Sequence, residues 1–76
     1  METMATGRID GKKVQELRLA RHLTQRQLSL EADVSNETVN KIERAREPKS
    51  VNLLTAHKIA DALGVEPKEL LDDLRR

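Results

Sequence analysis

Residues 23–44 read LTQRQLSLEADVSNETVNKIER, and this stretch contains the starts of two helices. Thr24 and Gln27 have the spacing of a capping box, in which each side chain accepts a hydrogen bond from the backbone N–H of the other residue. The leucine before this cap and the leucine at the fourth helical position have the spacing of a hydrophobic staple. The two signals agree and predict a helix over residues 24–32.

The second helix start repeats the same arrangement. Ser35 is a favourable cap, and Val34 and Val39 have the spacing of a staple. This pattern predicts a helix over residues 35–44. Asp33 falls in the turn before it, where aspartate tolerates left-handed backbone geometry better than most residues do. Two short helices joined by about three residues are typical of a helix-turn-helix, here at about residues 24–44.

The rest of the chain shows helical periodicity or helix caps and no strand pattern. We expect a first helix from the cap Asp10 to about His22, a fourth from a cap at Ser50 or Asn52 to Leu63, and a fifth from Pro67 to about Leu74. Residues 1–8 lack periodicity and are expected to form a flexible segment. The predicted fold class is therefore all-α, a compact five-helix domain over residues 9–76.

The composition excludes several classes of function. The chain has 76 residues, with no cysteine and no aromatic residue. Without aromatic rings it cannot stack bases as RNA-recognition sheets and single-strand-binding barrels do. Without cysteine it has no disulfide framework and no thiolate zinc site. His22 and His57 are far apart in the sequence and have no neighbours typical of a catalytic or metal site. We expect no catalysis, no metal and no cofactor.

Charge is distributed unevenly along the chain, although the net charge is only +1. Residues 8–49 hold ten Lys or Arg against seven Asp or Glu, whereas residues 50–76 hold four against five. The mild positive excess of the first part fits contact with nucleic acid, and it equally fits ordinary solvated surfaces. No apolar run approaches the roughly 18 residues of a membrane span, so we expect a cytoplasmic protein without membrane contact.

The helix over residues 35–44 has an outward face of mixed polar chemistry. Its outward positions hold two amides, one acid and two bases, at Asn36, Glu37, Asn40, Lys41 and Arg44. An amide can pair with adenine, a carboxylate can accept from the amino group of cytosine, and Lys or Arg can bind guanine or phosphate. An ordinary solvated face is the alternative, although two asparagines are poor helix formers and need a reason.

Several short motifs follow one another along the chain: Leu-Thr-Gln at residues 23–25, Val-Ser at 34–35, Ile-Glu-Arg at 42–44 and a helical run over 55–65. In this order they resemble the phage repressor/Cro-type (lambda repressor-like) helix-turn-helix family. The similarity covers roughly residues 12–72, nearly the whole chain. The chain departs from the family pattern at Asp33 and Ala45, where glycine is common, and in the stretch 46–54, which is about two residues longer.

The resemblance implies that the helix over residues 35–44 lies in the major groove of double-stranded DNA. The residues that it implies as base-reading are Ser35, Asn36, Glu37, Asn40 and Lys41. The residues that it implies as phosphate contacts, with the positive end of the second helix contributing, are Thr24, Gln25, Arg44, Arg46 and Lys49. We hypothesise that Glu37 accepts from base amino groups, because a carboxylate facing phosphates would otherwise only be repelled.

The resemblance also implies two structural features. Arg18 and Glu43 are expected to form an internal ion pair between the first and third helices. Leu70, Leu71 and Leu74 cannot all face one small core, and the family often dimerises through its C-terminal region. We expect a dimer contact among these leucines, with plain core or surface positions as the alternative.

The function expected from these observations is sequence-specific binding of double-stranded DNA by a small transcriptional regulator. The resemblance implies a homodimer on a pseudo-palindromic operator. The alternative is an antitoxin or another interaction module of the same fold, whose main partner is a protein such as a toxin or another regulator.

Overall fold

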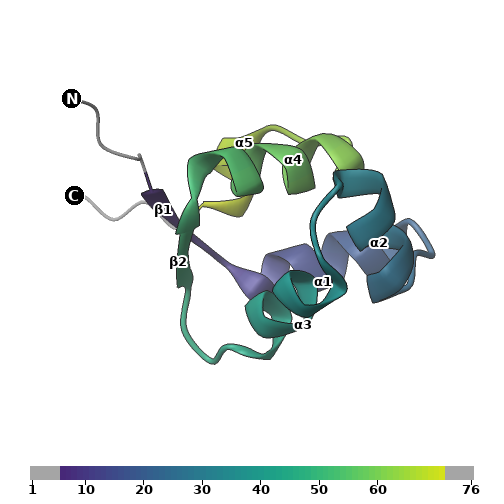
Figure 1. Cartoon of the computed structure of the whole chain (residues 1–76), viewed down its shortest axis with the longest axis horizontal. Coiled ribbons are helices and arrows are strands. Elements are labelled where there is room, and N and C mark those ends of the chain that lie inside the picture. Colours follow the sequence, from purple (N-terminus) through teal and green to yellow (C-terminus); the bar gives the residue numbers. More distant parts are fainter. Residues whose placement is uncertain (1–5, 72–76) are drawn as a thin grey trace.

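Five helices and two short strands make up the part of the chain that the computed structural model describes, residues 6–71 (Figure 1). In chain order they are β1 (Thr6–Ile9), α1 (Gly11–Ala20), α2 (Gln25–Ala32), α3 (Asn36–Arg44), β2 (Lys49–Asn52), α4 (Leu53–Leu63) and α5 (Pro67–Leu70). The predicted order of five helices is confirmed.

The first four helices begin at polar side chains that cap them. Asp10, Thr24, Ser35 and Asn52 each accept a hydrogen bond from a backbone N–H in the first turn of the following helix. Thr24 also forms the full capping box that the sequence predicts. For α4, the cap is Asn52, one of the two candidates. These local hydrogen bonds satisfy donors that a helix start leaves without a partner.

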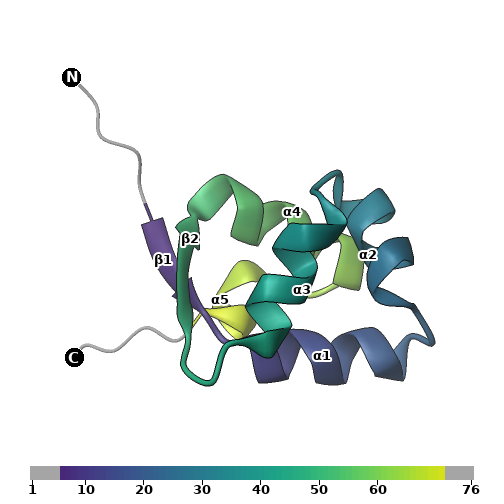
Figure 2. The ribbon, with the colours of Figure 1, turned by 60° about the horizontal axis from the view of Figure 1, so that its bottom comes forward.

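Left-handed residues end two of these helices and turn the chain. Asp33 closes α2 with a φ of 59°, which agrees with its predicted place in the turn, and Gly64 closes α4 with a φ of 74°. The chain then re-enters a helix within a few residues in both places. The Asp33 turn joins α2 to α3. In the view of Figure 2, α3 lies at the front of the domain.

The all-α fold class is confirmed, with two short strands added to the five helices. Residues 6–8, which we expected in a flexible segment, are instead part of a strand. These residues lie in β1, which pairs antiparallel with β2 in the register Thr6↔Asn52 to Ile9↔Lys49. The stretch after α3 that is longer than the family pattern contains β2. Four-residue strands have no local signal, because the partner that stabilises each one lies elsewhere in the chain.

One apolar core lies between the helices and extends to the end of β1. It contains Ile9, Val14, Leu28, Ala32, Val39, Ile42, Ala56, Ile59, Ala60, Leu63 and Leu70, each at most 3% exposed. These side chains are aliphatic throughout, as the composition requires. The core fixes the inward side of α3 and so determines which side of this helix faces outward.

One of the three C-terminal leucines does not fit the expected dimer contact. Leu70 is fully buried in the core, so it takes the core position that the sequence left open as the alternative. Leu71 is half-buried against the core, and its backbone forms an isolated antiparallel β-bridge with Ile9 at the end of β1. Leu74 lies outside the described residues. Helix α5 ends at Leu70, because Leu71 has extended backbone geometry.

No helix within residues 6–71 is long and apolar enough to cross a membrane.

Candidate nucleic-acid interface

Helix α3 presents one apolar and one polar side. Val39 and Ile42 are fully buried beneath it, whereas Asn36, Glu37 and Lys41 are exposed. These two apolar side chains anchor the helix on the core. Because an α-helix has 3.6 residues per turn, the polar positions then lie on the opposite, outward side. An exposed, mixed polar helix face of this kind has the shape and chemistry that fit the major groove of DNA.

Ser35 lies at the exposed start of α3 and serves as its cap. Its hydroxyl oxygen accepts from the backbone N–H of Thr38 at 3.0 Å and lies 2.8 Å from the hydroxyl of Thr38. The Ser35 side chain therefore has a structural role as a cap in addition to its predicted role in reading bases. Substitutions at this position act on the stability of α3 as well as on any DNA contact.

Glu37 and Lys41 form an ion pair along the exposed side of α3. The Lys41 ammonium lies 3.5 Å from a Glu37 carboxylate oxygen, and the side chains are 53% and 75% exposed. Because both groups are in water, this pair is weak and can be exchanged for other partners. Glu37 thus has a cation beside it that lessens its repulsion by phosphate.

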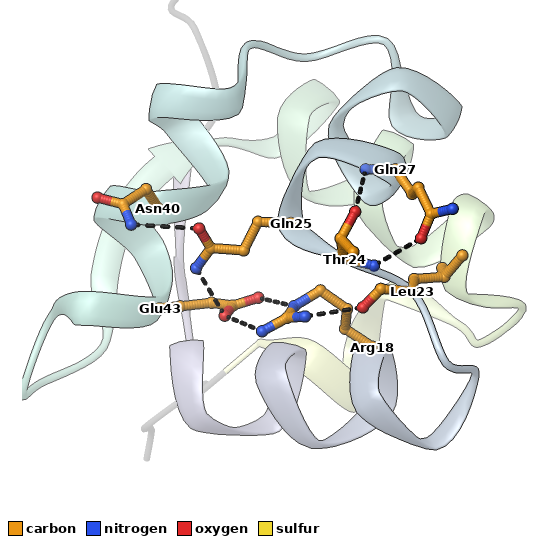
Figure 3. A network of polar contacts seen from close by, with 7 residues as sticks. All are labelled: Arg18, Leu23, Thr24, Gln25, Gln27, Asn40 and Glu43. Atoms are coloured by element: carbon orange, nitrogen blue, oxygen red, sulfur yellow. Dashed lines mark hydrogen bonds and ion pairs between the residues drawn. The ribbon is translucent and has the colours of Figure 1, made fainter.

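Arg18 and Glu43 form a second ion pair, on the inner side of α3. Arg18 Nε donates to Glu43 Oε2 at 2.8 Å and Arg18 Nη2 donates to Oε1 at 2.9 Å, while Nη1 donates to the carbonyl oxygen of Leu23 at 2.7 Å. The two side chains are only 9% and 2% exposed. This bidentate pair ties α1 to α3 and to the residue before the α2 cap, as Figure 3 shows.

The hydrogen bonds that Arg18 donates to Glu43 raise the pKa of the Arg18 guanidinium above its ordinary value, and burial opposes this effect only in part. A group whose pKa is raised on folding stabilises the fold at every pH below its unfolded pKa and loses this effect only as the pH passes through the folded pKa. Arg18 therefore remains charged, and the pair keeps its cation, until strongly alkaline pH.

Gln25 joins this buried pair to the polar side of α3. Its Nε2 donates to Glu43 Oε1 at 3.1 Å, and its Oε1 accepts from Asn40 Nδ2 at 3.2 Å (Figure 3). Gln25 and Asn40 are both half-buried. The structure thus brings together one predicted phosphate contact, one predicted base-reading residue and both members of the predicted ion pair. The hydrogen bonds of Gln25 were not predicted, because nothing in the local sequence indicates a partner on another helix.

The other predicted phosphate contacts lie at the two ends of the helix-turn-helix. Thr24 is exposed at the start of α2, where its hydroxyl oxygen accepts from the backbone N–H of Gln27 at 3.0 Å. At the other end, an open hollow follows α3, and its lining includes one exposed acid, Glu47, and the exposed cations Lys41, Arg44, Arg46 and Lys49. Several cations around one hollow favour an anion such as a backbone phosphate.

These features define a class of protein. Two short helices meet at a left-handed turn, the second exposes a polar side, and cations follow it, as in a helix-turn-helix domain that binds DNA. The model of the Helix-turn-helix family matches residues 14–70, so the chain belongs to this family, and it is of the phage repressor/Cro type that the sequence resembles. It is a DNA-binding transcriptional regulator.

Two similar proteins are named as controllers. Control protein C.BamHI of Bacillus amyloliquefaciens is 40% identical over 63 residues, which are 82% of this chain and 75% of that protein. The crystal structure of the restriction-modification controller protein C.AhdI from Aeromonas hydrophila matches with a TM-score of 0.69 at 34% identity. That match covers 78% of this chain and 86% of C.AhdI.

A structure of hydroxyethylphosphonate dioxygenase also matches, with a TM-score of 0.75 at 28% identity. The match covers 91% of this chain but only 14% of the dioxygenase. The similarity therefore concerns one small part of that enzyme, and it carries no argument for catalysis by this chain.

Proposed function

We propose that this protein binds an operator as a homodimer, with α3 in the major groove, and that it controls the genes of a restriction-modification system. The observation that carries the proposal is the exposed polar side of α3, held on the core by Val39 and Ile42. The similarity to the restriction-modification controller protein C.AhdI supports the restriction-modification context, and C.BamHI is likewise named as a control protein.

In the proposed complex, the first turn of α3 and the turn after it face base edges. Ser35, Asn36, Glu37, Asn40 and Lys41 read bases, while Thr24, Gln25, Arg44, Arg46 and Lys49 contact phosphates. The two copies of α3 then lie about one helical turn of DNA apart, or ~34 Å, on an inverted pair of half-sites. The net charge of only +1 implies modest non-specific binding, so the specific contacts decide occupancy.

Selection from a random pool of DNA duplexes tests this proposal. We expect enrichment of two inverted half-sites spaced by about 10 base pairs, and we expect this sequence to lie upstream of restriction or methyltransferase genes. If roughly four to six phosphates are contacted per subunit, the logarithm of affinity should fall by about four to five per subunit for each tenfold rise in salt.

Two variants divide the predicted contacts into classes. Lys49→Gln should weaken binding to every sequence. It should also reduce the slope of the logarithm of affinity against the logarithm of salt by about one per subunit, the amount expected for one lost phosphate contact. Asn36→Ala should instead change the enriched sequence at one position of each half-site. If the pool yields no preferred sequence under any salt condition, the proposed operator binding is wrong.

A further inference from the structure

Four side chains form a line of hydrogen bonds from the interior to the polar side of α3, in the order Arg18, Glu43, Gln25 and Asn40 (Figure 3). The two members nearer the surface, Gln25 and Asn40, are carboxamides, which carry a donor at one end and an acceptor at the other. The ends of a carboxamide have nearly the same shape, so its orientation depends on the groups around it. Here the buried pair of Arg18 and Glu43 determines the orientation of both carboxamides.

The direction of the line follows from the buried ion pair. The guanidinium of Arg18 can only donate, and the ionised carboxylate of Glu43 can only accept. Gln25 must therefore turn its Nε2 toward Glu43, and this places its Oε1 toward Asn40. The reverse orientation of Gln25 would place an amide oxygen against the carboxylate of Glu43.

The same logic orients the last side chain. Because Gln25 offers an oxygen, Asn40 must turn its Nδ2 inward to donate at 3.2 Å. Its Oδ1 then points away from Gln25, as Figure 3 shows. The free end of Asn40 is thus a hydrogen-bond acceptor, although an isolated asparagine on a helix surface can present either end.

We propose that Gln25 is a positioning residue for DNA specificity: held by Glu43, it makes Asn40 present its carbonyl oxygen to the major groove. This inference rests on the proposed binding of operator DNA by α3. An outward acceptor selects a base whose amino group lies in the major groove, which is adenine or cytosine. Guanine and thymine offer acceptor oxygens in the major groove and are disfavoured at this position.

The selected operator allows a direct test through measured affinities for all four bases at each position. For the wild-type protein, we expect one position in each half-site that prefers adenine or cytosine over guanine or thymine by about tenfold. Asn40→Ala should abolish this preference. Gln25→Met, which keeps the length of the side chain but removes both polar groups, should reduce the preference to about twofold or less, because Asn40 can then turn either end outward.

The matched control is Arg46→Gln, which removes one exposed positive charge after α3. It should lower the affinity for all four bases in the same proportion and leave their ratio unchanged. If Gln25→Met behaves like this control, Gln25 contacts phosphate only and the inference is wrong. The midpoint of urea unfolding, compared with that of the wild type, verifies that Gln25→Met folds.

A second readout needs no DNA. In the free protein, the side-chain amide protons of Asn40 should exchange with water more slowly than those of Asn36, which lies exposed on the same helix. Gln25→Met should remove this difference in NMR spectra. Equal exchange in the wild-type protein would overturn the inference. Failure to select any operator would remove the proposed function and the base preference together, whereas an operator whose base ratios survive Gln25→Met would remove only the inference.

Discussion

The two glutamates of α3 form ion pairs in opposite surroundings. Glu43, on the inner side, is 2% exposed and bonds at 2.8 Å to an arginine that is 9% exposed. Glu37, on the outer side, is 75% exposed and lies 3.5 Å from a lysine that is 53% exposed. The inner pair joins two helices that are far apart in the sequence, whereas the outer pair joins successive turns of one helix.

The difference separates two tasks within one short helix. Removing one partner of a buried pair leaves a charge without a partner away from water, which costs about 3–5 kcal/mol. An exposed pair between successive helical turns contributes only about 0.3–0.5 kcal/mol. The inner side of α3 therefore determines stability and position. The outer side can exchange its partners for DNA at little cost to the fold.

Arg18→Ala tests the inner side and should have the largest effect. The substitution leaves the buried carboxylate of Glu43 without its cation and removes the bond to the carbonyl oxygen of Leu23. We expect the free energy of unfolding to fall by about 3 kcal/mol, which urea denaturation measures.

The outer pair supplies the control for this measurement. Lys41→Ala removes the corresponding cation from Glu37 and should change the free energy of unfolding by less than about 0.5 kcal/mol. The double variant Arg18→Met with Glu43→Leu should recover much of the stability lost in Arg18→Ala, because it leaves no buried charge. Equal losses in the two single variants would contradict the contrast between the two sides of α3.

Gly11→Ala tests how closely α1 approaches the inner side of α3. A Cβ at residue 11 would overlap the carbonyl oxygen of Ile42 and lie 3.1 Å from the Cα of Glu43. Helix propensity alone favours alanine over glycine by roughly 0.5–1 kcal/mol. We expect the opposite sign, a net loss of about 1–3 kcal/mol in thermal or urea unfolding, because the backbone of α3 must move.

Lys13→Ala is the matched control on the same helix, because Lys13 is exposed. Its effect should stay within about 0.5 kcal/mol. If Gly11→Ala stabilises the protein, α1 and α3 are farther apart than described, and the inner side of α3 is less constrained than the contrast requires.

The two sides of α3 also differ in how far sequence could predict them. The caps of α2 and α3 depend on residues three positions apart, so local spacing was sufficient. The pair of Arg18 and Glu43 was expected only through the family resemblance. The bonds of Gln25 depend on where α2 and α3 meet in space, and no local pattern encodes that meeting.

The ends of the domain were harder to predict for the same reason. Strand β1 is stabilised by pairing with β2, more than thirty residues further along the chain. Leu70 could not be assigned to the core from its spacing, because three leucines in one turn and a half leave their direction open. Its burial follows from the way α5 packs on α4 and from the hydrogen bond that Asp10 donates to its carbonyl oxygen.

Glu37→Ala tests the outer side and should have only a small effect on the fold. The substitution removes a weak pair with Lys41 and a negative charge near the start of α3, so the free energy of unfolding should fall by less than about 1 kcal/mol. Its effect should instead fall on DNA. If Glu37 accepts from a base amino group, discrimination at one base position should drop by about 1–3 kcal/mol in titrations against operator variants.

The pattern across sequences separates this role from simple repulsion. Glu37→Gln removes the charge but keeps an acceptor, so it should retain part of the base preference while Glu37→Ala loses it. If both variants bind every sequence more tightly by the same factor, Glu37 only repels phosphate. The ion pair with Glu37 then competes with the contact of Lys41 to DNA. The contrast would then stand for stability, but base recognition would belong to the amides of α3 and not to its outer acid.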